Sequence, residues 1–134
     1  METLRKIDYV GQLVLAALVL LSIPILYLYG FLAGLLIMGC WQLISAALNT
    51  NAFIQSGRRK QIRTYWKCCI GDLTLILICW FSEEAIDADY TEAIFWIATT
   101  GAALIAVYYL TIYNRLLQFI SLRNELDGLT KSKH

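Results

Sequence analysis

The sequence predicts an all-α membrane protein, a bundle of four transmembrane helices with both chain ends on the cytoplasmic side. The chain has 134 residues, of which 59% are hydrophobic, and its mean hydropathy of +0.61 exceeds that of a soluble domain of this size. Only 16% of the residues are charged. They collect in blocks, as expected when charges avoid hydrocarbon and lie at the ends of spans. We therefore treat residues 1–134 as one membrane domain.

The first two spans, about 9–29 and 31–53, come from one uncharged stretch. No Asp, Glu, Lys, Arg or His occurs between Tyr9 and Ala52. As a helix this stretch would be about 66 Å long, whereas the hydrocarbon core is roughly 30 Å thick. Two helices fit that length, so we expect the chain to turn in the aromatic-rich segment at Gly30. Pro24 precedes the turn and removes one helix hydrogen bond.

The third and fourth spans are expected at about 65–82 and 93–114. The third is the weaker prediction because it contains Lys67 and Asp72. A lysine near a helix end can extend its amine to the headgroups, which leaves Asp72 as the candidate intramembrane charge. The alternative that this segment lies at the membrane interface remains open.

Loop charges predict the orientation. The loop between the second and third spans is basic, and the loop between the third and fourth is acidic, with Glu83, Glu84, Asp87, Asp89 and Glu92. Because basic loops stay in the cytoplasm, we expect both termini there, in a plasma or inner membrane. Contact with anionic lipid headgroups is a second expected role of the basic loop. Its residues are Arg58, Arg59, Lys60, Arg63 and Lys67.

A helical extension is expected to follow the fourth span, over residues 115–129. Its apolar residues are spaced three, four and three apart, which is typical of a heptad-like seam. The extension is predicted to end near Gly128, and residues 130–134 are expected to form a disordered tail. Docking on a neighbouring helix and association with the membrane surface are both open. The apolar positions are Phe119, Leu122, Leu126 and Leu129.

Asp72 is the first candidate for a functional site, because carboxylates inside a membrane usually face the bundle interior or water. We expect Gln12, Asn49 and Asn114 to share its level and to form with it a polar pocket that opens to the cytoplasm. The alternative is that these side chains only hydrogen-bond across helices and set the register. The same two roles are open for Gln42 in the middle of the second span.

Small residues predict where helices approach closely. Gly30 and Gly34 form a GxxxG pair at the start of the second span. A stripe of alanines, Ala98, Ala102 and Ala106, runs along the fourth. Whether the opposing helix belongs to the same chain or to another copy stays open.

The residues argue against an enzyme. The only histidine is His134, which excludes histidine-based zinc and haem sites and a Ser-His-Asp arrangement. No phosphate-binding glycine loop is present either. From these absences together we expect no cofactor, no metal and no nucleic-acid partner. We expect a non-enzymatic membrane protein that acts by self-association or as a membrane subunit of a complex. The alternative is an oligomeric ion channel, pore or small-solute transporter that uses Asp72.

Overall fold

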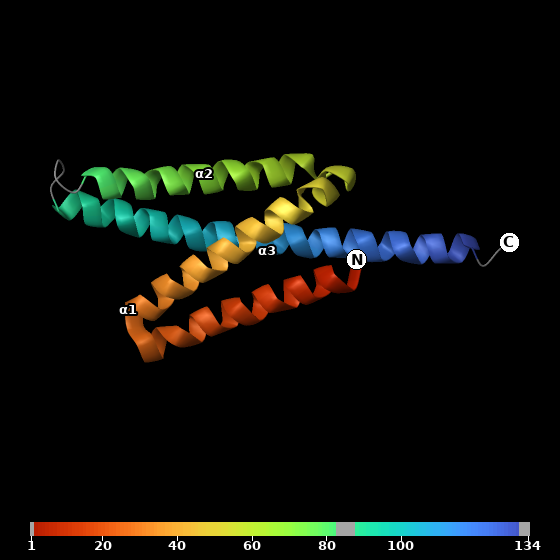
Figure 1. Ribbon diagram of the computed structural model, residues 1–134, viewed down its shortest axis with the longest axis horizontal. Coiled ribbons are helices and arrows are strands. Elements are labelled where there is room, and N and C mark those ends of the chain that lie inside the picture. Colours follow the sequence, from red (N-terminus) through yellow and green to blue (C-terminus); the bar gives the residue numbers. More distant parts are fainter. Residues whose placement is uncertain (1, 83–87, 132–134) are drawn as a thin grey trace.

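The computed structural model describes residues 2–82 and 88–131, and these residues form three helices (Figure 1). Helix α1 is Glu2–Gln55, α2 is Arg59–Ser82 and α3 is Ala88–Lys131. Part of the acidic loop (83–87) and the last residues (132–134) lie outside the described residues. The prediction of an all-helical protein is confirmed for the described part of the chain.

Helix α1 doubles back on itself into two antiparallel arms (Figure 1). A straight helix would separate Asp8 from Ser45 by about 55 Å, yet their side chains are hydrogen-bonded. Gly34 likewise lies against Val19. Both pairs are centred at Leu26, so the reversal lies about one helical turn before Gly30, where the sequence predicts it. We call residues 2–22 the first arm and residues 30–55 the second arm.

Gly57 ends α1. Its φ of 75° is a left-handed conformation that glycine adopts without steric cost. The amide of Gly57 donates to the carbonyl of Ile54 at 3.1 Å, and the amide of Arg58 donates to that of Phe53 at 2.9 Å. This pair of bonds is a Schellman cap. The chain therefore turns sharply after the second arm and enters α2 at Arg59.

The hydrophobic core lies at the end of the molecule where this turn is. Helices α2 and α3 run antiparallel, and the second arm of α1 crosses them (Figure 1). Tyr65 and Tyr109 pack across α2 and α3 with ring centroids 4.8 Å apart. Buried side chains at this end come from all three helices. They include Ala46, Phe53, Ile62, Tyr65, Cys69, Tyr109, Ile112, Tyr113 and Leu116.

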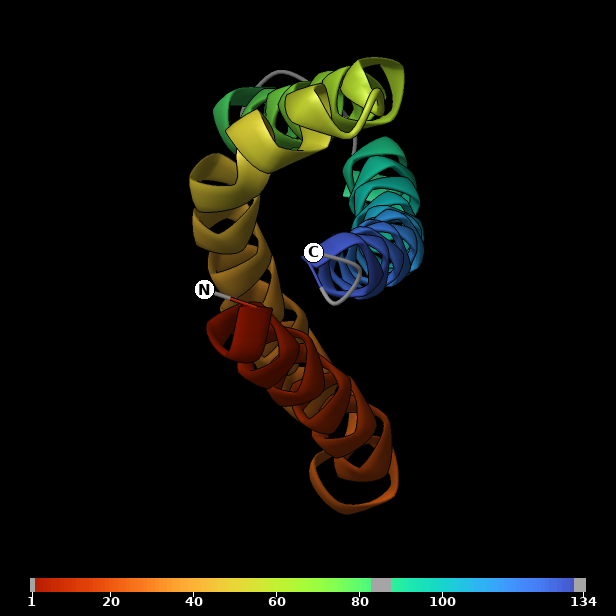
Figure 2. The same cartoon turned by 90° about the vertical axis from the view of Figure 1, so that its right-hand side faces the viewer.

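Away from this end, the reversal of α1 diverges from α2 and α3 (Figure 2). The four helical segments therefore meet at one end and separate toward the other, instead of packing along their whole length as a four-helix bundle does. The α1 arms cross α2 and α3 at an angle (Figure 1), and the hydrogen bond of Gln42 with Ala106 lies near this crossing.

Two stretches of the described residues are long and apolar enough to cross a membrane, Gly30–Gln55 and Tyr90–Leu126. Helix α3 also continues without a break from the predicted fourth span through residues 115–129 and ends at Lys131. The expected helix end near Gly128 is thus displaced by about one turn. The tail expected at 130–134 is helical at residues 130 and 131, and its remainder lies outside the described residues.

Candidate functional site

The carboxylate of Asp8 lies where both arms of α1 meet α3, and it accepts four hydrogen bonds. Its Oδ1 accepts from Trp41 Nε1 at 2.7 Å and from Gln12 Nε2 at 3.3 Å. Its Oδ2 accepts from Ser45 Oγ at 2.5 Å and from the Tyr113 hydroxyl at 2.9 Å. One carboxylate thus connects three helical segments.

A second set of hydrogen bonds supports these donors. The Tyr109 hydroxyl donates to Ser45 Oγ at 3.0 Å, and Ser45 in turn donates to Asp8. Asn49 Nδ2 lies 3.4 Å from the Tyr113 oxygen, and Tyr113 also donates to Asp8. Each hydroxyl accepts one bond and passes one on, an arrangement that orients both hydroxyls toward the carboxylate. We call Asp8, Gln12, Trp41, Ser45, Asn49, Tyr109 and Tyr113 the Asp8 network.

Among residues 2–82 and 88–131 no basic side chain forms an ion pair with Asp8. Its negative charge is therefore stabilised by hydrogen-bond donors. The nearest arginine along the first arm, Arg5, donates instead to Asn49 Oδ1 at 3.1 Å. Hydrogen bonds to an ionised carboxylate are stronger than neutral ones. The network therefore stabilises a negative charge between helices and ties the α1 hairpin to α3.

Gln12 is the most enclosed member of the network. Its side chain is 0% exposed, and its Oε1 has no hydrogen-bond partner among the described residues. A buried amide oxygen without a partner costs free energy. This cost arises because the Gln12 amide donates to Asp8 through its nitrogen, and its oxygen is left without a partner.

Of the residues in the Asp8 network, only Gln12 and Asn49 were predicted from the sequence. The signal that could have identified the others is a spacing of four residues between polar or aromatic positions, which places side chains on one helix face. It occurs once on each segment that meets here. The three series are Asp8 and Gln12; Trp41, Ser45 and Asn49; and Tyr109 and Tyr113.

Asp72 does not join this network, so the expected pocket of Asp72 with Gln12, Asn49 and Asn114 is corrected. Asp72 projects from α2 toward Gly101 on α3, where an added Cβ would lie 2.7 Å from its Oδ1. Gly101 precedes Tyr113 by 12 residues along α3, which is about 18 Å. Asn114 is exposed, because it follows Tyr113 and points about 100° away from it around the helix.

Gln42 forms a contact between helices: it is 2% exposed, and its Nε2 donates to the carbonyl oxygen of Ala106 at 3.2 Å. Ala98 and Ala106 are buried, and Ala102 is partly buried. Gly34 approaches Val19 of the first arm so closely that an added Cβ would lie 2.6 Å from a Val19 methyl. The opposing helix at Gly34 thus belongs to the same chain.

The predicted basic residues surround the turn between α1 and α2. Arg59, Lys60, Arg63 and Lys67 are exposed, and Arg58 is partly buried. All of them except Lys67 line a hollow of about 690 Å³. Within the described part of the chain, no group of three His, Cys, Asp or Glu side chains could hold a metal ion.

Comparisons with protein-family models, with curated proteins and with solved structures gave no match to this chain. The function of the chain is therefore inferred from the geometry of the Asp8 network, of Asp72 and of the basic turn.

Proposed function

We propose that the chain is an integral membrane protein that crosses the bilayer four times, by the two arms of α1, by α2 and by α3. In this proposal both termini and the basic turn are cytoplasmic, in a plasma or inner membrane. The four segments alternate in direction (Figure 1). Large apolar side chains such as Leu36, Leu48, Leu77 and Leu104 are exposed on three helices, as expected for surfaces that face lipid or partner helices.

Within the membrane, we propose a non-enzymatic function by self-association or as a membrane subunit of a complex. The observation that carries this is the projecting end of α3. Among the residues of α3 whose burial is described, which end at Leu126, the last buried one is Leu117, and the helix continues to Lys131, about 21 Å beyond Leu117. Leu122 and Leu126 on this end are 61% and 63% exposed. They lie one helical turn apart and outside the predicted spans, so lipid would not cover them. Contact with another protein surface would bury them.

The test is the mass of the complex in detergent, measured by light scattering with the detergent contribution subtracted. We expect wild type to be larger than one chain of 15.2 kDa. The double substitution Leu122→Ser with Leu126→Ser should shift it toward the monomer. The matched control, Arg123→Ser with Glu125→Ser, changes exposed polar residues of the same turn and should leave the mass unchanged. A monomeric wild type at all concentrations, without a co-purifying membrane partner, would contradict the proposal.

A channel or transporter that uses Asp72 is the second candidate. Asp72 is the carboxylate on α2 that lies partly buried against α3, at a depth where charge is costly. Flux from liposomes tests it. Asp72→Asn should abolish flux, and Thr74→Val, which changes an exposed residue of the same helix, should preserve it. Absence of flux in wild type would exclude this candidate for the solutes tested.

A further inference from the structure

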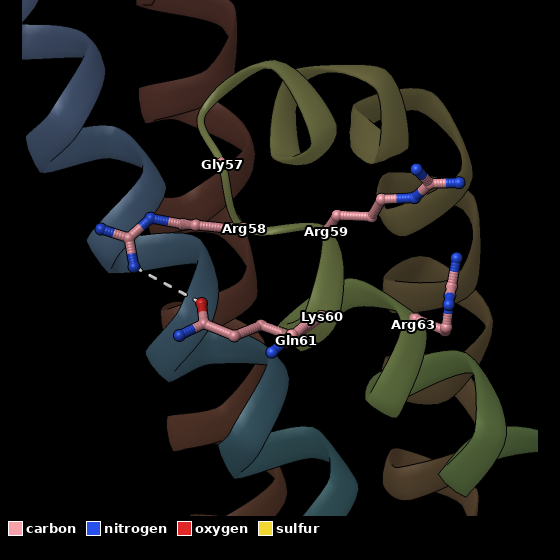
Figure 3. A pocket seen from close by; sticks show the side chains of 6 residues that line it. All are labelled: Gly57, Arg58, Arg59, Lys60, Gln61 and Arg63. Atoms are coloured by element: carbon pink, nitrogen blue, oxygen red, sulfur yellow. Dashed lines mark hydrogen bonds between the residues drawn. The ribbon is translucent and has the colours of Figure 1, made fainter.

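Basic side chains surround the hollow at the start of α2 (Figure 3). It is lined by Gly57, Arg58, Arg59, Lys60, Gln61 and Arg63, and we call this set the basic hollow. Arg59 and Arg63 are four residues apart, so they share one face of α2. Their guanidinium groups lie on the same side of the turn, whereas Arg58 extends to the other side toward Gln61 (Figure 3).

Within the part of the chain that the structure describes, no carboxylate compensates the charges of the basic hollow. Within residues 2–82 and 88–131, Arg58 has one side-chain partner, the neutral oxygen of Gln61 at 3.4 Å. The Nε of Arg58 is buried without a hydrogen-bond partner. No carboxylate of the described residues pairs with Arg59, Lys60 or Arg63. Within the described residues, the guanidinium groups of Arg59 and Arg63 therefore lie on one side of the turn with no carboxylate paired to either.

This arrangement is unfavourable for the protein alone. Like charges four residues apart on a helix repel each other and lower its stability. The first turn of a helix carries unpaired amides and a positive partial charge, which favours acidic residues there, yet the first turn of α2 has none. An anion in the basic hollow would relieve both effects at once.

We propose that the basic hollow binds a phosphate group, and that Arg59 and Arg63 clamp it with their guanidinium groups. A guanidinium donates two parallel hydrogen bonds to phosphate oxygens. Two guanidinium groups on one helix face can therefore bind the same phosphate from two sides. Arg58 and Lys60 also line the basic hollow and add positive charge near the turn. The same chemistry is offered by a phosphate lipid headgroup and by a soluble phosphate. This inference goes beyond the proposed role in assembly. It depends on the proposed membrane orientation only if the bound phosphate belongs to a lipid headgroup.

Calorimetric titration of the full chain in an uncharged detergent tests the site. One arm uses short-chain phosphatidic acid, the other uses inorganic phosphate, and phosphatidylcholine serves as the blank. The substitution Arg59→Gln with Arg63→Gln should weaken binding about thirtyfold, or about 2 kcal/mol, as expected when two bases beside an anionic headgroup are lost. The control is Arg115→Gln with Arg123→Gln, which removes the same charge from exposed positions of α3 and should weaken binding less than about threefold.

The substitution Arg59→Lys with Arg63→Lys separates a built site from diffuse attraction. It keeps the charge but removes the two-pronged donors, so binding should fall about fivefold or more. Binding of the lysine variant equal to wild type would overturn the proposal, as would no binding of either probe or an equal loss in the α3 control. Binding of phosphatidic acid alone assigns a lipid source, and binding of inorganic phosphate shows that the phosphate group suffices; each supports the site. Thermal midpoints without ligand that are at least as high as that of wild type confirm that the variants are folded.

Discussion

The hydroxyl of Tyr113 donates a hydrogen bond of 2.9 Å to the carboxylate of Asp8, which lies 105 residues earlier in the chain. The same carboxylate holds Trp41 and Ser45 of the second arm. One ionised side chain therefore links both arms of the α1 hairpin to α3. Its four donors would lose their acceptor if it were removed.

Replacement of Asp8 by Asn should destabilise the protein by about 3 kcal/mol. The amide nitrogen would face two donors, and the remaining bonds would lose the contribution of the charge. Tyr113→Phe removes one of the four bonds and should cost about 1–2 kcal/mol. The measurement is unfolding in mixed detergent micelles. The exposed neighbour Asn114 is the control, and Asn114→Ala should change stability by less than about 0.5 kcal/mol. Equal stability of Asp8→Asn and wild type would refute a structural role for the network.

Gly34→Ala should weaken the α1 hairpin by about 1–3 kcal/mol, because the new methyl group would lie 2.6 Å from a branch of Val19. The substitution Val19→Ala should restore most of the loss when the two are combined, as a double-mutant cycle would show. Gly39→Ala is the matched control, since nothing lies within 4 Å of its added Cβ. It should be neutral or slightly stabilising in a helix. A similar cost at both glycines would contradict the close approach.

Gly57→Ala should destabilise the turn between α1 and α2 by about 1–2 kcal/mol, because alanine is strained at a φ of 75°. Gly57→Asn should cost less, since asparagine tolerates the left-handed region. Thermal unfolding of both variants in detergent gives the order. Gly71→Ala, in a helix with open space around it, should show no loss, and a loss equal to that of Gly57→Ala would argue against a conformational cause.

Gly101→Ala should displace the carboxylate of Asp72 from α3 and cost about 1 kcal/mol, since the added Cβ would lie 2.7 Å from Oδ1. In an Asp72→Ala background the same substitution should be neutral or favourable, because alanine is the better helix former. The comparison of unfolding free energies in the two backgrounds measures the contact. An equal cost in both would show that Asp72 does not face Gly101.

Hydropathy was enough to predict the helical class and the reversal of α1. A charge-free stretch too long for one span must turn, and glycine with aromatic neighbours marks where. The contacts of Asp8 with Ser45 and of Val19 with Gly34 are centred at Leu26, about one helical turn before that glycine. These features can be predicted from the sequence because the uncharged stretch and its turn residues are consecutive in the chain.

The candidate site was predicted only in part, because the depth and direction of its side chains depend on the register between helices. Asp8 follows two bases, a position typical of an interface charge. Its hydrogen bond with Ser45 instead places Asp8 level with a residue deep in the second span. Ser45 precedes Phe53, the expected end of that span, by eight residues, or about 12 Å along the helix. Asp72 shows the converse: hydropathy indicates its depth but not which side of α2 it occupies, and that side turns toward Gly101.

The concentration of the core at one end gives α1 the mechanics of a lever. Its pivot is the contact of Asp8 with Tyr113, and its reach to the reversal at Leu26 is 18 residues of helix, about 27 Å. Tilting such an arm by about five degrees would carry its far end through about 2 Å, while the pivot hardly moves. Small adjustments at the pivot are therefore amplified at the reversal of the hairpin, which diverges from α2 and α3 (Figure 2).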